Sequence, residues 1–477
     1  MNSVLLTLII ILPLIGVFLI HQADKKNKAD YHLLHVLITF CVMILSVYLS
    51  IKTEYNTISD GPQFITNISI SKHFSYRIAT DSINILFILI TSIIFFSVTL
   101  IDGTSENKEN NIFSLISQCG IMGILCSKNV LFLTLFMLLA FLPIFKICIK
   151  DKHSIIELSA SFILFLVLMI CICAGSVPLA NQSKEFNLAY LSDCKLAANL
   201  QIYLLPLFLI VISVFSGIPP VNRWLEYSSK NELKHVATVS IISKFGIFIG
   251  FYIILKPFPE AIKFYSIYIT IAAVILIIYK LIEAFRSKDL TKQFINYSSI
   301  HSTIVIMLLF SAMTEDLLKG IILSYISSLL IMAILLSSAK ILNEIKIFGE
   351  EIQGLTSAMA KFRTCFLFGL FSMLSMPGTI SFTGQFVILV ALINSNNIFA
   401  FAVLLFFPIV TACYILKTSF NILYGNLPAS YYNLKDIGYL NSAGFAILII
   451  MLIILGFCPY IIDVPIDSFV KLTLHQL

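Results

Sequence analysis

The stretch Val236-Ala-Thr-Val-Ser-Ile-Ile-Ser-Lys-Phe-Gly-Ile-Phe-Ile-Gly-Phe-Tyr-Ile-Ile-Leu255 reads as a membrane-spanning segment with one charged group, the amine of Lys244. An α-helix of about 20 residues crosses the hydrocarbon core of a bilayer. An ammonium group near the centre of such a helix costs roughly 2.5–3.5 kcal/mol on insertion scales. Lys244 can avoid this cost by snorkelling to an interface or by facing protein or water. Its near-central position favours a polar role inside the protein.

The composition of the whole chain extends this interpretation. Of the 477 residues, 59% are hydrophobic and only 12% are charged, whereas soluble proteins carry about 25% charged residues. The apolar runs are continuous, which excludes an outer-membrane barrel of short alternating strands. The sequence therefore predicts an all-α polytopic protein embedded in the lipid bilayer. The net charge of +6 gives no reason to expect a nucleic-acid partner.

Fourteen spans are predicted, at 4–20, 33–51, 84–101, 112–126, 129–148, 154–174, 201–218, 236–255, 262–282, 294–313, 319–338, 364–394, 399–418 and 440–460. If the N-terminus lies outside the cytoplasm, the cytoplasmic loops hold 18 of the 31 Lys and Arg residues and the opposite loops hold 8. This bias fits the positive-inside rule. It predicts a multi-pass protein with both termini on the non-cytoplasmic side. A bacterial inner membrane is the expected location, and an organellar inner membrane is the alternative. The cluster Lys25, Lys26 and Lys28 follows the first apolar run, the reverse of a signal peptide, so we expect that run to remain as a span.

Two segments are predicted to interrupt helices. The run 364–394 is too long for one regular span, and Pro377 and Gly378 near its middle should break it. Pro219 and Pro220, which follow the seventh span, form the second predicted break. We divide the chain into three N-terminal spans (1–110), a core (111–395) and C-terminal helices (396–477).

The titratable residues inside the predicted membrane are few. No carboxylate lies at the centre of a span, so the candidates are Lys244, His301 and Lys292, with Lys280 near the end of the ninth span. The His301 side chain either takes part in proton transfer, because an unperturbed histidine titrates near neutral pH, or it only forms a hydrogen bond to a neighbouring helix. Lys292 is either a cytoplasmic topology charge or part of a relay. The ten cysteines form no metal-binding or disulfide pattern, and no cofactor motif is present.

Three segments resemble one family of membrane subunits. Gly217-Ile-Pro-Pro-Val-Asn-Arg-Trp-Leu225 followed by Ser243-Lys244 resembles the Trp-Leu motif and lysine-bearing helix of the antiporter-like subunits of proton-pumping NADH–quinone oxidoreductase and Mrp-type cation/proton antiporters. Lys292-Gln-Phe-Ile-Asn-Tyr-Ser-Ser-Ile300 is similar to a second motif of that family. Met376-Pro-Gly-Thr-Ile-Ser-Phe-Thr-Gly-Gln-Phe386 is similar to the motif of its M-type subunit.

The resemblance implies two inverted five-helix repeats with broken helices and a polar axis at mid-membrane. It implies membrane subunits of a respiratory or antiporter complex as partners, and protons or monovalent cations as the transported species. Lys244, Lys292, His301 and Gln385 are the expected proton path. The chain should carry no active site of its own, although its complex can be an enzyme.

Several positions depart from the family pattern. A glutamate expected on the fifth span is replaced by Leu138, and a central histidine of the second repeat falls near Tyr325. The last charged position is Gln385, whose amide can bond water but carries no proton away at neutral pH. The expected function is a contribution to proton translocation. The alternative is a non-pumping structural paralogue that has lost the charged axis.

Overall fold

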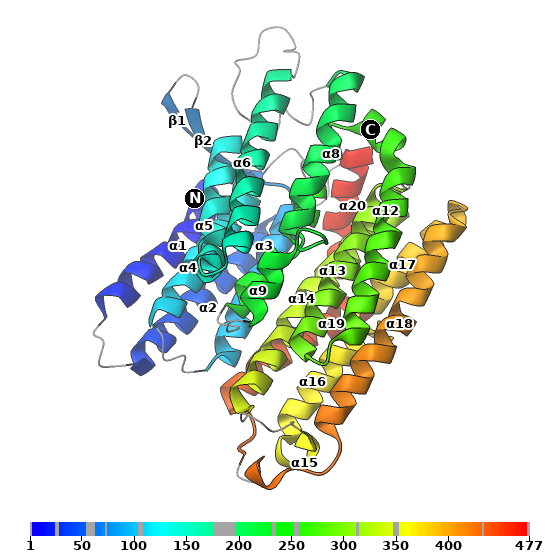
Figure 1. Cartoon of the computed structure of the whole chain (residues 1–477). Helices are drawn as coiled ribbons and strands as arrows, with labels where there is room; N and C mark the ends of the chain where they lie inside the picture. Colours follow the sequence, from blue (N-terminus) through cyan, green and yellow to red (C-terminus); the bar gives the residue numbers. More distant parts are fainter. Residues whose placement is uncertain are drawn as a thin grey trace.

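The computed structural model describes residues 2–23, 28–53, 63–71, 74–103, 108–175, 196–230, 235–251, 255, 257–311, 314–346, 353–431 and 434–474. Within these ranges the chain forms a bundle of long helices with one small hairpin at an end (Figure 1). Lys25 and Lys26 of the predicted charge cluster lie outside the described residues.

The N-terminal part contains α1 (Asn2–Gln22), α2 (Lys28–Lys52), β1 (Gln63–Ser71), β2 (Phe74–Thr80), α3 (Ser82–Ile101), α4 (Lys108–Cys126), α5 (Val130–Cys148) and α6 (Lys152–Gly175). The middle part contains α8 (Ala198–Phe215), α9 (Arg223–Lys230), α10 (Val236–Ile242), α11 (Phe245–Ile249), α12 (Pro259–Arg286), α13 (Leu290–Leu309) and α14 (Glu315–Ile345). The remainder contains α15 (Leu355–Ala358), α16 (Ala360–Met373), α17 (Ile380–Asn394), α18 (Ile398–Leu423), α19 (Tyr439–Phe457) and α20 (Tyr460–Leu474), with a short 3₁₀ turn at Ala429–Tyr431.

The predicted polytopic helical class is confirmed. Ten helices among the described residues are long and apolar enough to cross a membrane, and every one of the fourteen predicted spans coincides with helical structure. The span 364–394 is divided between α16 and α17, as predicted. The helix α20, which carries Asp463 and Asp467 and follows α19 directly, was not predicted as an element.

Helix α14 lies at the centre of the bundle. The most apolar 18-residue window of α14 is entirely buried, whereas only 22% of the corresponding window of α12 is buried. Helix α14 packs against α17, α13, α16, α10 and α3. Helix α19 also packs against α3, so the predicted first and third segments of the chain adjoin each other. The proposed boundaries at residues 110 and 395 stay predictions.

Two broken helices share one local design. Helix α8 ends at Phe215, and Gly217 (φ 60°) precedes Pro219 and Pro220 before α9 begins. Helix α16 ends at Met373, and Ser375 (φ 59°) precedes Pro377 and Gly378 (φ 91°) before α17 begins. In both breaks a residue with left-handed backbone stands two positions before a proline, which cannot continue the helix. The four residues predicted as helix breaks therefore lie in breaks.

The two broken helices also run in opposite directions across the bundle. In Figure 1 the chain descends along α8 toward α9 and ascends from α16 to α17. This antiparallel relation of two similar breaks, one in each half of the core, is what inverted repeats produce. The breaks are thus an internal sign of the repeat architecture that the sequence motifs imply.

A third break corrects one prediction. The segment 236–255 was expected to be one continuous span, but α10 ends at Ile242 and α11 begins at Phe245, with Lys244 (φ −116°, ψ 0°) between them. The Lys244 N–H bonds the Ile241 carbonyl over 3.1 Å, three residues back. Tight packing beside the break has a cause in the sequence: a Cβ at Gly246 would lie 2.3 Å from the Ile212 carbonyl oxygen. Glycine permits this approach.

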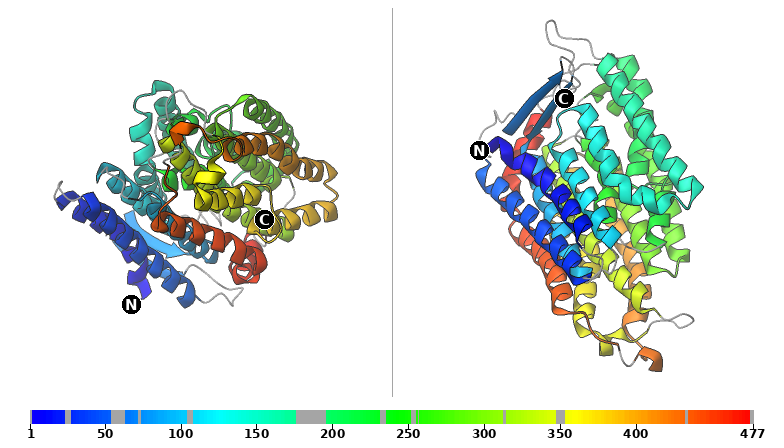
Figure 2. Two further views of the ribbon diagram at one scale, coloured as in Figure 1. Left: turned by 90° about the horizontal axis from the view of Figure 1, so that it is seen from below. Right: turned by 90° about the vertical axis from the view of Figure 1, so that its left-hand side faces the viewer.

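The β1–β2 hairpin is the exception to the helical class among the described residues. The strands pair antiparallel, with Thr66 opposite Ile78. An isolated bridge joins Ile78 to Ser127, and Lys128 forms an ion pair with Asp81. These contacts attach the hairpin to the α4–α5 connection. Both chain termini lie toward the hairpin end of the bundle in Figure 2, as an even number of spans requires.

Candidate functional site

The Lys244 side chain turns from the break between α10 and α11 toward α13. Its Nζ donates to the Ser298 carbonyl oxygen at 2.7 Å and to the Ser302 Oγ at 3.0 Å. The residue is 0% exposed, so it does not snorkel. The first polar groups that this amine meets therefore belong to a single helix.

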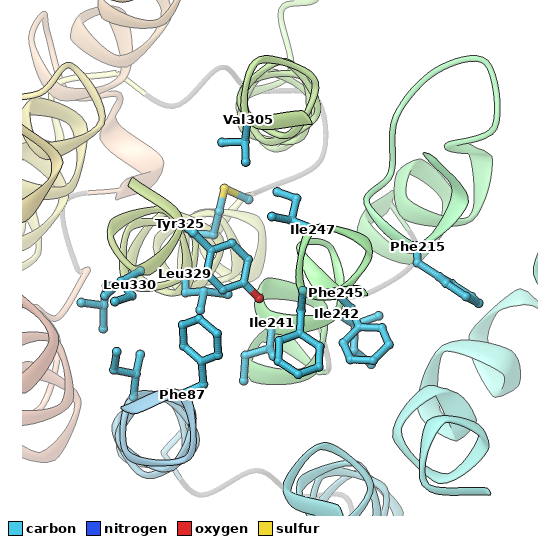
Figure 3. Close-up of a cluster of buried hydrophobic side chains, with 14 of the residues drawn as sticks. Phe87, Phe215, Ile241, Ile242, Phe245, Ile247, Val305, Tyr325, Leu329 and Leu330 are labelled. Carbon is cyan, nitrogen blue, oxygen red and sulfur yellow. The ribbon is translucent and has the colours of Figure 1, made fainter. Parts of the chain in front are cut away.

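Apolar side chains surround the break. Figure 3 shows Ile241, Ile242 and Phe245 facing Phe87 of α3 and Tyr325 of α14. Tyr325 stands where the family pattern has a histidine, and its ring packs edge-on against Phe87 at 5.3 Å. The hydrogen bonds of the Lys244 side chain are accordingly made to α13.

No carboxylate of the described part of the chain forms an ion pair with Lys244 within 4.0 Å. Leu138, at the position of the expected glutamate, is 46% exposed on the outer side of α5. The structure therefore agrees with the family pattern drawn from the sequence: no carboxylate reaches Lys244 from this position of α5. A charged Lys244 is stabilised only by the carbonyl and hydroxyl of α13 and by more distant groups.

His301 lies on α13 beside the Lys244 contact. Its Nε2 hydrogen-bonds the Ser324 Oγ of α14 at 2.9 Å, whereas its Nδ1 has no protein partner. His301 directly precedes Ser302, whose Oγ accepts a hydrogen bond from Lys244. The expected bond to a neighbouring helix is present, and His301 joins the Lys244 site to the central helix.

Gln385 lies on α17 and is half-buried. The structure shows no hydrogen bond from its side chain to Lys244 or His301. Its neighbour Gly384 makes the close contact instead, because a Cβ there would lie 2.8 Å from the Ser324 backbone nitrogen. Helix α17, the second half of the broken helix, therefore packs its backbone at Gly384 against Ser324, the hydrogen-bond partner of His301.

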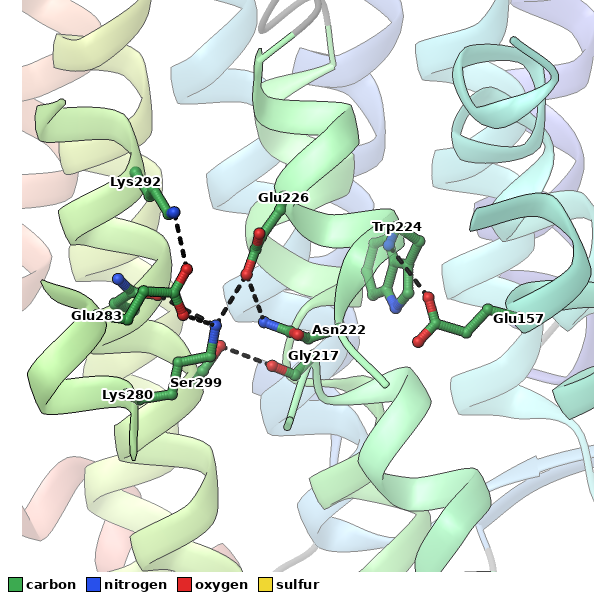
Figure 4. A network of polar contacts seen from close by, with 10 residues as sticks. Glu157, Gly217, Asn222, Trp224, Glu226, Lys280, Glu283, Lys292 and Ser299 are labelled. Carbon is green, nitrogen blue, oxygen red and sulfur yellow. Dashed lines mark hydrogen bonds and ion pairs between the residues drawn. The ribbon is translucent and has the colours of Figure 1, made fainter. Parts of the chain in front are cut away.

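Lys292 belongs to a second polar group, built around Lys280 (Figure 4). The Lys280 Nζ donates to Glu226 Oε1 at 2.8 Å and to Glu283 Oε2 at 2.7 Å, and to Asn296 Oδ1 at 3.3 Å. Lys292 Nζ pairs with Glu283 Oε1 at 2.8 Å. We call Glu226, Lys280, Glu283 and Lys292 the four-charge cluster.

The break after α8 positions Glu226. Asn222 Nδ2 donates to Glu226 Oε1 at 3.0 Å, and the Trp224 Nε1–H donates to the Val214 carbonyl oxygen at 2.7 Å. The Trp224 backbone N–H donates to Glu157 Oε2 at 3.3 Å. Trp224 is 0% exposed, and its indole donates to a carbonyl at the end of α8.

The connection between α5 and α6 anchors the same region. Asp151 accepts from Ser154 Oγ at 2.6 Å and from Arg223 Nε at 3.2 Å. The Ser154 hydroxyl, and to a lesser degree the Arg223 guanidinium, hold the pKa of Asp151 below its usual range. Asp151 therefore stays ionised and ties the start of α9 to the start of α6.

A row of polar groups on α13 lies between Lys244 and the four-charge cluster. Asn296 contacts Lys280, Ser298 and Ser302 contact Lys244, and the Ser299 Oγ donates to the Gly217 carbonyl oxygen in the first break at 2.6 Å. Helix α13 thus carries groups that both accept and donate hydrogen bonds, the kind of groups along which protons transfer.

The sequence interpretation missed the role of Glu226 and Glu283. Glu226 lies in the predicted loop between the spans 201–218 and 236–255, and Glu283 directly follows the span 262–282, so neither is a candidate inside the membrane. One signal was available: Lys280 and Glu283 are three residues apart, a spacing that brings side chains together on a helix. Nothing in the local sequence pairs Glu226 with Lys280, which is 54 residues away.

Comparisons with known proteins agree with the motifs. Residues 127–411 match the family profile described as NADH:quinone oxidoreductase/Mrp antiporter, TM. NADH-quinone oxidoreductase subunit M of Rickettsia felis is 26% identical, with 95% of each chain covered. NADH-ubiquinone oxidoreductase chain 4 of Marchantia polymorpha is 25% identical, covering 82% of this chain and 81% of its own.

Solved structures share the fold. A chain of respiratory complex I from Thermus thermophilus with bound NADH superposes with a TM-score of 0.83 at 17% identity, covering 99% of both chains. A chain of the Mrp complex from Dietzia gives a TM-score of 0.79 at 14% identity, covering 99% of this chain and 97% of that one.

Proposed function

The chain belongs to the NADH:quinone oxidoreductase/Mrp antiporter family of membrane subunits, and from this premise we propose that it contributes to proton translocation within a multi-subunit membrane complex. The subunit M relative is covered over 95% of its length, and the M-type motif lies at Met376–Phe386. Both favour an NADH–quinone oxidoreductase assembly over an Mrp-type antiporter. Its partners are then the other membrane subunits of that assembly.

The observation that carries the proposal is the environment of Lys244. The amine is fully buried, bonded to one carbonyl and one hydroxyl, and has no carboxylate within 4.0 Å among the described residues. A carboxylate would stabilise the ammonium form. The Ser302 hydroxyl accepts from the amine and donates its own proton to the Ser298 carbonyl oxygen at 2.9 Å. Rotation of that hydroxyl would let it donate to the neutral amine instead. The site therefore accommodates both protonation states, as a group that takes up and releases protons must.

The position of the site supports the same function. Lys244 lies at a helix break, and broken helices at membrane depth occur where they line a cavity or are buried in protein. The break packs against α13, whose His301 reaches the central helix α14. A proton at Lys244 thus has polar neighbours on the side that faces the second repeat.

The proposed orientation places the four-charge cluster at the cytoplasmic end. The loops at that end hold the excess of Lys and Arg, which the positive-inside rule assigns to the cytoplasm. Both termini and the hairpin then lie on the opposite side of a bacterial inner membrane. The four-charge cluster accordingly lies where protons would enter from the cytoplasm.

A non-pumping structural subunit is the second candidate. Leu138, Tyr325 and Gln385 occupy positions where the family pattern has titratable groups, and the Leu138 side chain faces outward. Such a subunit would fill a place in the assembly without a titration cycle at Lys244. The two functions predict different effects of removing the amine.

The test is NADH-driven proton uptake by inside-out membrane vesicles that contain the assembled complex. Lys244→Ala is compared with Lys146→Ala, a control that removes a 44% exposed lysine paired with Glu109 at 2.5 Å. Translocation through this subunit predicts a large loss of proton uptake per NADH for Lys244→Ala only. Equal uptake by both variants and the wild type would establish the structural role instead.

A further inference from the structure

We propose that the face where the α16–α17 break meets the turn between α19 and α20 is a subunit interface, covered by a transmembrane helix of another subunit that carries a lysine or arginine. The inference rests on the membrane assembly named in the proposed function, but not on proton translocation. Five exposed residues define this surface, which we call the break face: Met376, Pro377, Phe457, Tyr460 and Asp463.

The turn between the C-terminal helices lies directly against the α16–α17 break. Helix α19 ends at Phe457, and α20 begins three residues later. The Thr383 Oγ donates to the Gly456 carbonyl oxygen at 3.2 Å, and a Cβ at Gly456 would lie 2.5 Å from the Gly378 carbonyl oxygen. The backbones of two helix interruptions therefore touch each other.

Two ion pairs near opposite ends of α14 indicate where the membrane lies. Lys340 pairs with Asp102 at 2.7 Å, and Lys319 pairs with Asp467 at 2.8 Å. From Lys319 to Lys340 the helix rises about 31 Å. The hydrocarbon core of a bilayer is about 30 Å thick, so the two ion pairs mark its two edges.

The register of α17 against α14 places the break at mid-depth. Gly320 lies against Ile388, and Ser324 lies against Gly384, so residue numbers fall along α17 as they rise along α14. By this register Gly378 lies about ten residues from the level of Gly320, which is a rise of about 15 Å. Half of the distance between the two ion pairs is about the same length. The break therefore lies near the bilayer midplane.

The break face is exposed although it lies at this depth. Met376, Phe457 and Tyr460 are 44%, 71% and 68% exposed. The flanking Phe382 and Phe386 are also exposed, so the surface around the break is apolar. Irregular backbone occurs at membrane depth only where protein surrounds it or where it lines a water-filled cavity. Lipid tails do not meet this requirement, and a protein segment from outside the described chain does.

The first break shows that exposure is not a property of the break itself. Gly217, Ile218 and Pro219 are all buried within the chain. In the second break no residue from Ser375 to Gly378 is buried, although the two breaks share one local design. The chain thus covers one of its two breaks and leaves the other for a partner.

Asp463 determines the charge of that partner. Its side chain is exposed and forms no hydrogen bond or ion pair within the described part of the chain. Asp467, one turn further along α20, is the residue that pairs with Lys319, so Asp463 lies about 6 Å closer to the membrane centre. Carboxylates inside membranes are costly and normally pair with a cation or another polar group. A lysine or arginine of the partner helix supplies the cation.

The same contacts give the spacing that the partner helix needs. Phe457 marks the level of the break, because a Cβ at Gly378 would lie 3.1 Å from its ring. Asp463 follows Phe457 by six residues, which is about 9 Å at the helical rise. A partner helix that runs alongside therefore carries its basic residue about six positions from the apolar residues that cover the break.

Asp463→Lys is the discriminating variant, because like charges that face each other across an interface are strongly unfavourable. The readout is the fraction of the membrane-inserted chain that is found in the assembled complex on a native gel. We expect this fraction to fall by about tenfold or more, which corresponds to roughly 1.4 kcal/mol or more. A fraction equal to that of the wild type would overturn the inference.

The matched control is Asp316→Lys. Asp316 is an exposed carboxylate in the first turn of α14, about 4.5 Å beyond Lys319 on the solvent side. Its reversal changes the net charge by the same amount without touching the break face. We expect the assembled fraction of this variant to stay within about twofold of the wild type, and a loss equal to that of Asp463→Lys would overturn the inference.

Photocrosslinking covers the case in which Asp463→Lys does not insert into the membrane. A photoreactive phenylalanine analogue in place of Phe457 keeps an exposed aromatic ring at that position. In the full complex in its native membrane we expect a crosslink to a different membrane subunit. Crosslinks to lipid alone, or to a second copy of this chain, would overturn the inference.

The proposed function fails on a different measurement. Equal proton uptake by Lys244→Ala and the wild type refutes translocation, and it leaves the interface standing if the crosslink forms. Loss of uptake in Lys244→Ala together with crosslinks to lipid alone refutes the interface and leaves translocation standing.

Discussion

Gly384→Ala should disturb the junction between α17 and the His301–Ser324 contact. The added Cβ would lie 2.8 Å from the Ser324 backbone nitrogen and 3.2 Å from the Leu323 carbonyl carbon. Ordinary Cβ contacts begin at 3.4 Å, so the two backbones must separate by about 0.6 Å. Overpacking of this kind typically costs about 1–3 kcal/mol.

The displacement reaches the proposed proton path because Ser324 supplies the 2.9 Å partner of His301. A shift of about 0.6 Å is enough to take such a bond out of its normal range. A typical hydrogen bond contributes about 0.5–1.5 kcal/mol, which corresponds to roughly a two- to tenfold change in a rate. We therefore expect proton uptake to fall within that range, together with a lower thermal stability of the assembled complex.

Gly250→Ala is the matched control for this prediction. Its added Cβ would meet only side-chain ends, Leu309 Cδ2 at 3.2 Å and Ile212 Cδ1 at 4.0 Å, which can move aside. The assay is NADH-driven proton uptake together with scanning calorimetry of the purified complex. If Gly384→Ala matches Gly250→Ala in both measurements, the inferred contact between the second broken helix and the path is refuted.

Three further outcomes follow from the same contacts. Trp224→Phe removes the 2.7 Å indole donor of the Val214 carbonyl, which keeps the Gly217 N–H as a donor at 3.1 Å. Calorimetry should therefore show a destabilisation of about 0.5–1.5 kcal/mol from the lost bond, and unchanged stability would contradict the anchoring role. Lys244→Met removes two hydrogen bonds to the amine, but it also removes the free-energy cost of burying that amine. The amount of assembled complex should therefore stay near the wild-type amount while proton uptake is lost. A failure to assemble would assign the lysine a structural role. Cysteines at the exposed positions Ile65 and Asn426 should react with an impermeant reagent from the periplasmic and the cytoplasmic side, respectively, and reversed labelling would refute the proposed orientation.

The helices and two of the breaks could be predicted because their signals are local. Apolar runs of spanning length give the helices, and the Pro219-Pro220 and Pro377-Gly378 pairs remove the backbone freedom that a helix needs. Lys244 and His301 were identified in the same way, since a titratable residue inside an apolar run stands out.

The break at Lys244 could not be predicted from the sequence around it. No proline lies in 236–251, and the feature found beside the break is a tertiary contact, the close approach of Gly246 to the carbonyl of Ile212. The burial of Trp224 has a similar origin, because its partner is a carbonyl that only the preceding break leaves available. The composition of an apolar run predicts that the run is helical, but it does not show which backbone segment packs against that helix.

The four-charge cluster was missed for a related reason. Glu283 and Lys292 lie just outside the ends of predicted spans, and Glu226 lies in a predicted loop, where charges are usually solvated. In the folded chain these residues lie around Lys280, which is inside the predicted span 262–282. Lys280 is visible in the sequence near the end of the ninth span, but the structure was needed to show that two carboxylates bond it.

The most direct test of proton translocation through this subunit is proton uptake per NADH by the complex that carries Lys244→Arg. Arginine keeps a positive charge and bonds the same carbonyl and hydroxyl, but it cannot give up its proton. A titrating amine predicts that uptake through this subunit is lost while NADH oxidation and assembly persist. Wild-type proton uptake by Lys244→Arg would contradict the account.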